Sequence, residues 1–226
     1  FTLKWYDQMI HSSRLHRALM NSVKVGVIAS IFSTFIALLA AKAFTKYKVK
    51  LRQLSYGAIL LPFVIPEIII AVSLIVLWTG MGLQLGLVPV TISHILFCTP
   101  FCMLVLISRM EGFDRNLEEA AMDLGENAWG TFWRVTFPLA LPAIVASLLL
   151  SFVISFDEFI LAFFLSSHDQ TLPLYMWGQL RFPKKLPHVL ALGAVIIVAT
   201  SIIVMLSYWL RNLGSPSDKK SNIGGI

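Results

Sequence analysis

Five long apolar runs are the feature of this sequence that most limits its fold. A helix needs roughly 20 apolar residues to cross a hydrocarbon core of about 30 Å. Backbone groups in lipid must be hydrogen-bonded internally, and the runs lack the alternating pattern of barrel strands. The sequence therefore predicts an all-α polytopic membrane protein with five transmembrane helices. The five runs cover residues 19–44, 57–80, 88–108, 138–165 and 188–211.

The composition excludes an ordinary water-soluble domain. Hydrophobic residues make up 57% of the chain and charged residues 13%, and the mean hydropathy is +0.79. Soluble domains average about 45–50% apolar and about 25% charged residues. The net charge of +6 is scattered between the apolar runs and forms no basic stripe, so no nucleic-acid partner is expected. The bilayer is the predicted surrounding.

The cations are distributed unequally between the two sides of the predicted bundle. The loops after the first and third runs and the segment after the fifth hold 11 Lys and Arg residues, against 6 on the opposite side. Basic loops stay in the cytoplasm, so the C-terminus is predicted to be cytoplasmic and the N-terminus external. An external start predicts a further helix upstream. We therefore expect residues 1–18 to form an external segment following that helix, 19–214 the transmembrane domain and 215–226 a cytoplasmic tail.

The cytoplasmic connection at residues 111–137 has an amphipathic pattern. Asn116 is the predicted N-cap of a short helix, Glu118 and Glu119 lie in its first turn, and Gly125 is placed to end it. Apolar or small residues recur at helical spacing along this segment, and aromatic residues follow in the next turn. These residues are Leu117, Ala120, Ala121 and Leu124, followed by Trp129, Phe132 and Trp133.

The same connection carries a motif. The motif consists of Glu119-Ala120-Ala121, three residues, Gly125, nine residues and then Val135-Thr136-Phe137-Pro138. It resembles the EAA loop of bacterial ABC importer permeases, with Val135 and Phe137 in place of Ile and Leu. Further segments are similar, more narrowly, to the second permease of spermidine/putrescine importers. These segments are Ser108-Arg109, Gly112-Phe113-Asp114, Glu118 to Gly125, Ser155-Phe156-Asp157-Glu158 and Thr171-Leu172-Pro173-Leu174.

This resemblance implies a type I, MetI-like permease bundle in the bacterial inner membrane, with five of six family helices present. The subunit would form half of the pathway for a small solute, foremost a polyamine. Its implied partners are a second permease, an ABC ATPase dimer and an external substrate-binding protein. ATP and Mg would be bound by the ATPase, so no cofactor and no catalysis are expected in this chain. The implied ATPase-coupling residues are Glu118, Glu119, Ala120, Ala121, Asp123, Leu124, Gly125 and Trp129.

An alternative interpretation of the loop is an amphipathic helix lying on lipid headgroups. The tryptophans fit that alternative. The acids on the polar face oppose it, because the inner leaflet is itself anionic.

Three acids lie within the apolar runs, where a charge is costly. Phe63, Glu67 and Trp78 lie on one predicted helical face. An acid between aromatic residues can bind an ammonium group by ion pairing and by cation–π contact. Glu158 continues a helical stripe through Ser151 and Ser155 and is ranked above Asp157. The predicted substrate pathway thus comprises Glu67, Asp157, Glu158, Phe63, Trp78, Ser151 and Ser155.

A structural explanation of these acids stays open. Lys24 lies in the first run and is the best candidate partner for an intramembrane ion pair. A lysine near the pathway would also repel a polycation. Import of another small solute, such as an amino-acid derivative, an opine-like compound or an anion, therefore remains an alternative.

Other chemistry is poorly supported by the sequence. His94, Cys98 and Cys102 align at i, i+4, i+8, but no fourth ligand is near, so no metal site is expected. No phosphate-binding loop and no catalytic grouping occurs in the sequence, which argues against an enzyme.

A secondary transporter or channel subunit using the intramembrane acids is the alternative from another class. In the external loop 166–187, the cations Arg181, Lys184 and Lys185 are expected to face a binding protein.

Overall fold

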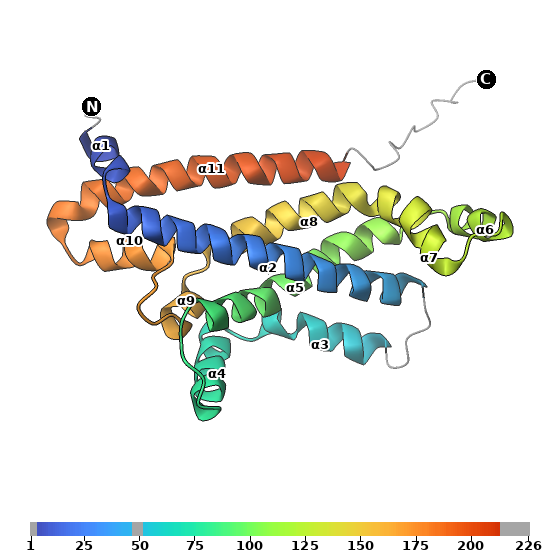
Figure 1. Ribbon diagram of the computed structural model, residues 1–226, viewed down its shortest axis with the longest axis horizontal. Coiled ribbons are helices and arrows are strands. Elements are labelled where there is room, and N and C mark those ends of the chain that lie inside the picture. The colour runs from blue at the N-terminus through green and yellow to red at the C-terminus, as the bar shows by residue number, and fades with distance from the viewer. Residues whose placement is uncertain (1–3, 47–51, 213–226) are drawn as a thin grey trace, which may run out of the picture.

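Four long helices lie alongside one another and define the long axis of the molecule (Figure 1). The computed structural model describes residues 4–46 and 52–212, and a short helix, α1 (Lys4–Ile10), precedes the first long one. The described residues contain four helices long and apolar enough to cross a membrane, or five if one bent pair is a single span. The predicted all-helical polytopic fold is thereby confirmed. The long helices are α2 (Ser13–Lys46), α5 (Leu87–Met110), α8 (Phe137–Asp157) and α11 (Leu186–Asn212).

The second apolar run is broken, contrary to the prediction of one kinked helix. It forms α3 (Arg52–Val64) and α4 (Glu67–Gly80), which are bent by 101° relative to each other. Pro66 causes the break, since it has no N–H to donate and it disfavours helical backbone at Ile65. As a result α4 projects away from the bundle axis (Figure 1).

The fourth apolar run is also broken, again contrary to the prediction of one helix. After α8 the backbone is extended at Glu158, with φ −68° and ψ 122°, and α9 (Ile160–Leu165) follows. The predicted external loop 166–187 contains a further helix, α10 (Leu172–Leu180), and a single 3-10 turn (Pro183–Lys185).

The core is formed where α2 packs between α5 and α8. Small α2 residues allow this close approach, since Ala29, Ser33 and Ala37 are fully buried, as their helical spacing predicts. One hydrogen bond between side chains crosses this core. Ser33 and Ser151 share a hydrogen bond of 2.7 Å between their hydroxyls, which joins α2 to α8.

The expected segment boundaries differ slightly from the helix ends. Helix α2 already begins at Ser13, within the predicted external segment 1–18, and α11 ends at Asn212. The predicted tail 215–226 lies outside the described residues, as do four of the counted cations, Lys48, Lys50, Lys219 and Lys220.

Candidate functional site

The connection between α5 and α8 folds into a helix, as the amphipathic pattern predicts. Helix α6 (Arg115–Asp123) is capped by Asp114, whose carboxylate accepts the Asn116 N–H at 3.0 Å. The predicted cap, Asn116, instead lies inside the helix, because the extended backbone that a cap requires occurs at Asp114. The predicted end is confirmed, since Gly125 has a φ of +93°, in the region that favours glycine.

The second half of the loop is continuous with α8. Asn127 caps α7 (Ala128–Thr131), accepting the Gly130 N–H at 2.8 Å. One π-helical turn (Phe132–Thr136) then leads directly into α8. Because this segment has no flexible break, a force applied to α7 is passed to α8 as movement of a rigid body.

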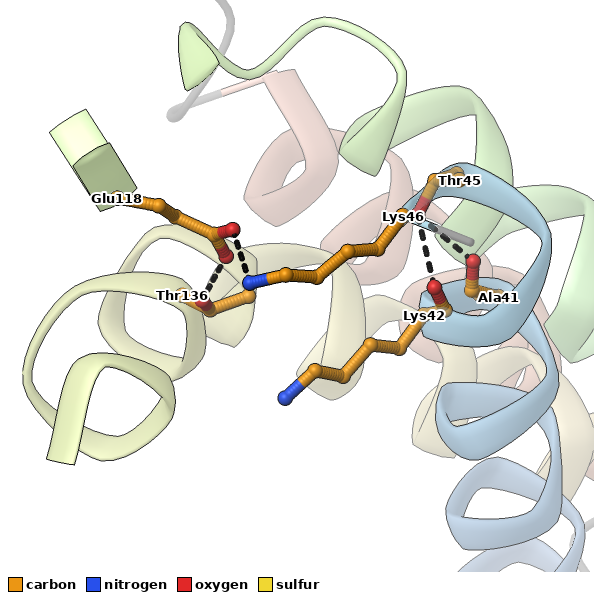
Figure 2. A network of polar contacts seen from close by, with 6 residues as sticks. All are labelled: Ala41, Lys42, Thr45, Lys46, Glu118 and Thr136. Atoms are coloured by element: carbon orange, nitrogen blue, oxygen red, sulfur yellow. Dashed lines mark hydrogen bonds and ion pairs between the residues drawn. The ribbon is translucent and has the colours of Figure 1, made fainter. Parts of the chain in front are cut away.

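Glu118 attaches α6 to the bundle (Figure 2). Its carboxylate accepts a hydrogen bond of 2.6 Å from Lys46 Nζ, and its other oxygen accepts one from the Thr136 hydroxyl. Partial burial on its own would raise the pKa of Glu118, but the bonds from Lys46 and Thr136 hold that pKa below the usual value. The carboxylate therefore stays ionised and bound at neutral pH.

A second contact joins the same elements. Lys42, one turn before Lys46 on α2, places its Nζ 4.0 Å from the centroid of the Phe132 ring. An ammonium group at that distance from a ring face is attracted by the ring quadrupole. Helix α2 thus holds the loop at two points.

Another part of the loop exposes two large apolar side chains next to acids. Leu124 is 88% exposed and Trp129 70% exposed, although both are large hydrophobic residues. Glu119, Ala120 and Asp123 are exposed beside them, whereas Ala121 is half-buried. This docking face, consisting of the exposed side chains just named, lies at one end of the bundle (Figure 1). Exposed apolar surface of this kind is typical of a protein interaction site.

Two of the seven predicted pathway residues are acids at the breaks of their spans. Helix α4, which begins at Glu67, packs against α9, which follows the break at Glu158. Glu67 is half-buried in the first turn of α4, and Glu158 is 8% exposed. Within residues 4–46 and 52–212, Lys24 forms no salt bridge with either acid.

The helical stripe of serines predicted on the fourth run is buried and not exposed to water. Glu158 lies in the break after α8, and its carboxylate accepts the Leu161 N–H of α9 at 2.8 Å. Ser151 and Ser155 are buried in the core, where Ser155 forms a 2.7 Å hydrogen bond with His94 Nδ1. This burial does not favour a role for the two serines in lining a passage.

Asp157 differs from Glu158 in being exposed. It borders a cavity of about 440 Å³ between α8, α10 and α11. Phe159 and Trp177 also line this cavity, with ring centroids 5.5 Å apart. A carboxylate beside two aromatic rings can bind a cationic group.

The shared face predicted for Phe63, Glu67 and Trp78 is interrupted, because the break at Pro66 separates Phe63 on α3 from Glu67 and Trp78 on α4. Phe63 stays on α3 and stacks edge-on against Phe101 of α5 at 4.3 Å. Trp78 lies near the far end of α4, where its indole N–H donates to the Gln84 carbonyl at 2.9 Å.

His94, Cys98 and Cys102 are buried along α5 and contact neighbouring helices. Cys98 and Cys102 approach the carbonyls of Ser151 and Ser147 at 3.7 Å. In the part of the chain that the structure describes, no three His, Cys, Asp or Glu side chains form a group suited to a metal ion.

Sequence reasoning missed the two partners of Glu118. Lys46 is 72 residues away from it in sequence and Thr136 is 18 residues away. Helical periodicity connects only residues within a few turns, so no local pattern could have found these contacts.

Comparison with known proteins places this geometry in context. Residues 33–217 match the model of the family described as binding-protein-dependent transport system inner membrane component. The spermidine/putrescine transport system permease protein PotC of Escherichia coli K12 is 33% identical over 100% of this chain and 84% of its own length. The putrescine transport system permease protein PotI of the same strain is 27% identical over 93% of this chain and 77% of its own length.

Solved structures share the fold. A crystal structure of a bacterial ABC transporter that imports the acidic polysaccharide alginate has a TM-score of 0.70 at 20% identity, covering 92% of this chain and 78% of the other. An alginate ABC transporter in complex with a periplasmic protein has a TM-score of 0.72 at 17% identity, with coverage of 95% and 84%.

Proposed function

The chain belongs to the family of binding-protein-dependent transport system inner membrane components, and on that premise we propose that it conducts polyamines and is driven through its α6–α7 loop. It is a non-catalytic permease subunit of an ABC importer in the inner membrane. A chain of this kind supplies a pathway, and the energy comes from hydrolysis on another subunit.

The exposed docking face carries the proposal of ATPase coupling. Leu124 and Trp129 are exposed at the tip of the loop, while Glu118 holds the loop to the bundle. We propose that an ABC ATPase binds this face, that two ATPases serve this chain and a second permease, and that the loop and the C-terminus are cytoplasmic. Closure of the ATPases would then tilt α8 through α7 and alternate the opening of the passage. ATP and Mg would bind on those partners.

The acids at the helix breaks support the choice of a polyamine. Glu67, Glu158 and Asp157 place three acids at or directly beside the breaks of the two broken spans. A polyamine carries ammonium groups spaced along an apolar chain, which suits carboxylates next to aromatic rings. The relatives named above are spermidine/putrescine and putrescine permeases, which favours the same class.

Replacing Asp157 by asparagine tests the substrate. We expect this change to lower putrescine and spermidine uptake about tenfold, because the neutral amide loses the attraction to an ammonium group while filling the same space. The measurement is ATP-dependent uptake into vesicles that contain the complete complex with its binding protein. Asp7→Asn, which neutralises an exposed acid on α1 outside both the loop 111–137 and the helix breaks, is the control for removal of one negative charge. Unchanged polyamine uptake by D157N, or uptake of a neutral or anionic solute alone by the unaltered complex, would contradict the proposal.

A further inference from the structure

The Glu118 carboxylate joins three helices at the end of the bundle that carries the docking face (Figure 2). Its partners are Lys46, the last residue of α2, and Thr136, the residue before α8 begins. The side chains of Lys46 and Glu118 are only 28% and 24% exposed. A charged hydrogen bond that is shielded from water and shared with a third group is held more firmly than a surface ion pair.

The other ion pair of the same loop is different in kind. Arg134 binds Glu126, and both residues lie within the loop itself. Arg134 is 75% exposed. This pair stabilises the loop but connects it to no other helix, whereas the Lys46–Glu118 pair crosses from the loop to α2.

Helix α2 is also attached at its far end. The Ser22 hydroxyl accepts the Leu172 N–H at 2.7 Å, and the Asn21 amide donates to the Gln170 carbonyl at 3.0 Å. Asn21, Ser22 and Leu172 are buried, and Leu172 is the first residue of α10. The start of α10 is therefore fixed to α2 by two hydrogen bonds.

Between its two attachments α2 is one uninterrupted helix. It spans 34 residues without a proline, while α5 and α8 contain Pro100 and Pro142. From Ser22 to Lys46 it extends about 36 Å at 1.5 Å per residue. Its small residues are closely packed against α5 and α8, and a packed helix moves as a unit rather than bending.

We propose that Lys46 and Thr136, through Glu118, are positioning residues that make α6 move together with α2 and α8, and that α2 carries this movement to the start of α10. The inference rests on the proposed coupling of the loop to an ATPase. It assigns different tasks to two neighbouring acids. Glu118 faces the bundle and fixes the helix, whereas Glu119 is exposed and available to the ATPase.

Reversing the ion pair tests the first part of this inference. In the complete complex, K46E and E118K are each expected to lower ATP hydrolysis stimulated by the loaded binding protein about fivefold or more, the range of a typical coupling between sites. The double variant K46E/E118K is expected to recover most of the stimulation, because the pair can form again with its charges exchanged. A residue that only stabilises the fold would change the yield of complex, and not the stimulation per complex. Full stimulation in K46E, or a double variant no better than the single ones, would overturn the proposal.

Distances between pairs of spin labels test whether α6 and the start of α10 move together with α2. This measurement does not depend on a charge-reversal variant assembling into the complex. A pair on exposed positions of α2 and α6, Leu39 and Asn116, neither of which is in the docking face, is expected to keep the same distance in the nucleotide-free and ATP-bound complex. A pair on α2 and α10, Leu19 and Leu180, is expected to do the same. R134Q, which breaks the pair internal to the loop, is expected to leave the first distance unchanged, whereas K46Q lets it vary between states. A change of either distance in the otherwise unaltered complex would overturn the proposal.

The proposed function and the positioning role of Glu118 fail in different experiments. If the unaltered complex shows no ATP-driven uptake, the proposed function is wrong. If that complex transports normally but the charge reversal has no effect on stimulation, only the positioning role of Lys46 and Glu118 is wrong.

Discussion

Leu124→Glu is expected to separate this permease from its ATPase. Leu124 is 88% exposed at the tip of the loop, so the change removes no contact within the chain. In the complex the same side chain would be buried against the ATPase, and burying an unpaired carboxylate there is costly. A central apolar interface residue contributes about 2 kcal/mol or more to binding, which corresponds to roughly thirtyfold weaker association. The measurement is the amount of ATPase that copurifies with the permease.

A matched variant controls for a new surface charge. Leu180→Glu places the same carboxylate at a half-exposed leucine on α10, at the other end of the bundle. It is expected to copurify with the ATPase as the unaltered chain does. Equal copurification of both variants would show that the docking face is not the ATPase contact.

Gly125→Pro is expected to uncouple hydrolysis from uptake. The φ of Gly125 is +93°, whereas proline fixes φ near −65°. Proline also lacks the N–H that Gly125 donates to the Met122 carbonyl at 2.9 Å. The chain must therefore leave α6 in another direction, which displaces the docking face relative to α7. We expect uptake to fall at least about tenfold. Moving the docking face away from the ATPase is expected to cost more than about 1.4 kcal/mol of the free energy of that contact.

A second glycine of the loop provides the control. Gly112 has ordinary backbone angles, and a Cβ there would meet only the Arg109 carbonyl oxygen at 3.5 Å. Gly112→Ala is expected to leave uptake nearly unchanged. Uptake by G125P equal to that of G112A would show that the direction of the chain at Gly125 does not matter.

The sequence predicted the helices and the loop because both follow from local chemistry. Apolar runs of bilayer length identified the spans, and the spacing from Leu117 to Leu124 with a final glycine identified α6. The coupling residues of the docking face were instead implied by the resemblance of the loop to the EAA motif, and the exposure of Leu124 and Trp129 is a finding of the structure.

The breaks were not predicted, because a proline in a membrane helix can produce either a kink or a break. Pro100 and Pro142 lie inside continuous helices, whereas Pro66 separates two helices bent by 101°. The packing of α4 against α9 decides between these outcomes, and that packing is not encoded locally. The break after Asp157 has no proline at all. Sequence periodicity therefore placed Phe63 on one helical face with Glu67, and Glu158 on one helical face with Ser155, although each pair is divided by the end of a helix.

The pairing of Lys46 with Glu118 lay beyond local reasoning for a related reason. The sequence indicates that both residues lie on the same side of the membrane, but not that α2 and α6 meet there. That contact depends on how the loop folds back over the end of α2, which is a property of the tertiary structure.

Site-specific cross-linking shows whether an ATPase drives this chain at the α6–α7 loop. The chain's two cysteines, Cys98 and Cys102, are buried, so a cysteine introduced at Leu124 is the accessible thiol at the loop. In native membranes, Leu124→Cys is expected to cross-link to the ATPase in a manner that depends on nucleotide, while Leu180→Cys does not. Cross-links from Leu124→Cys to lipid alone, with none to a nucleotide-hydrolysing subunit, would contradict the account.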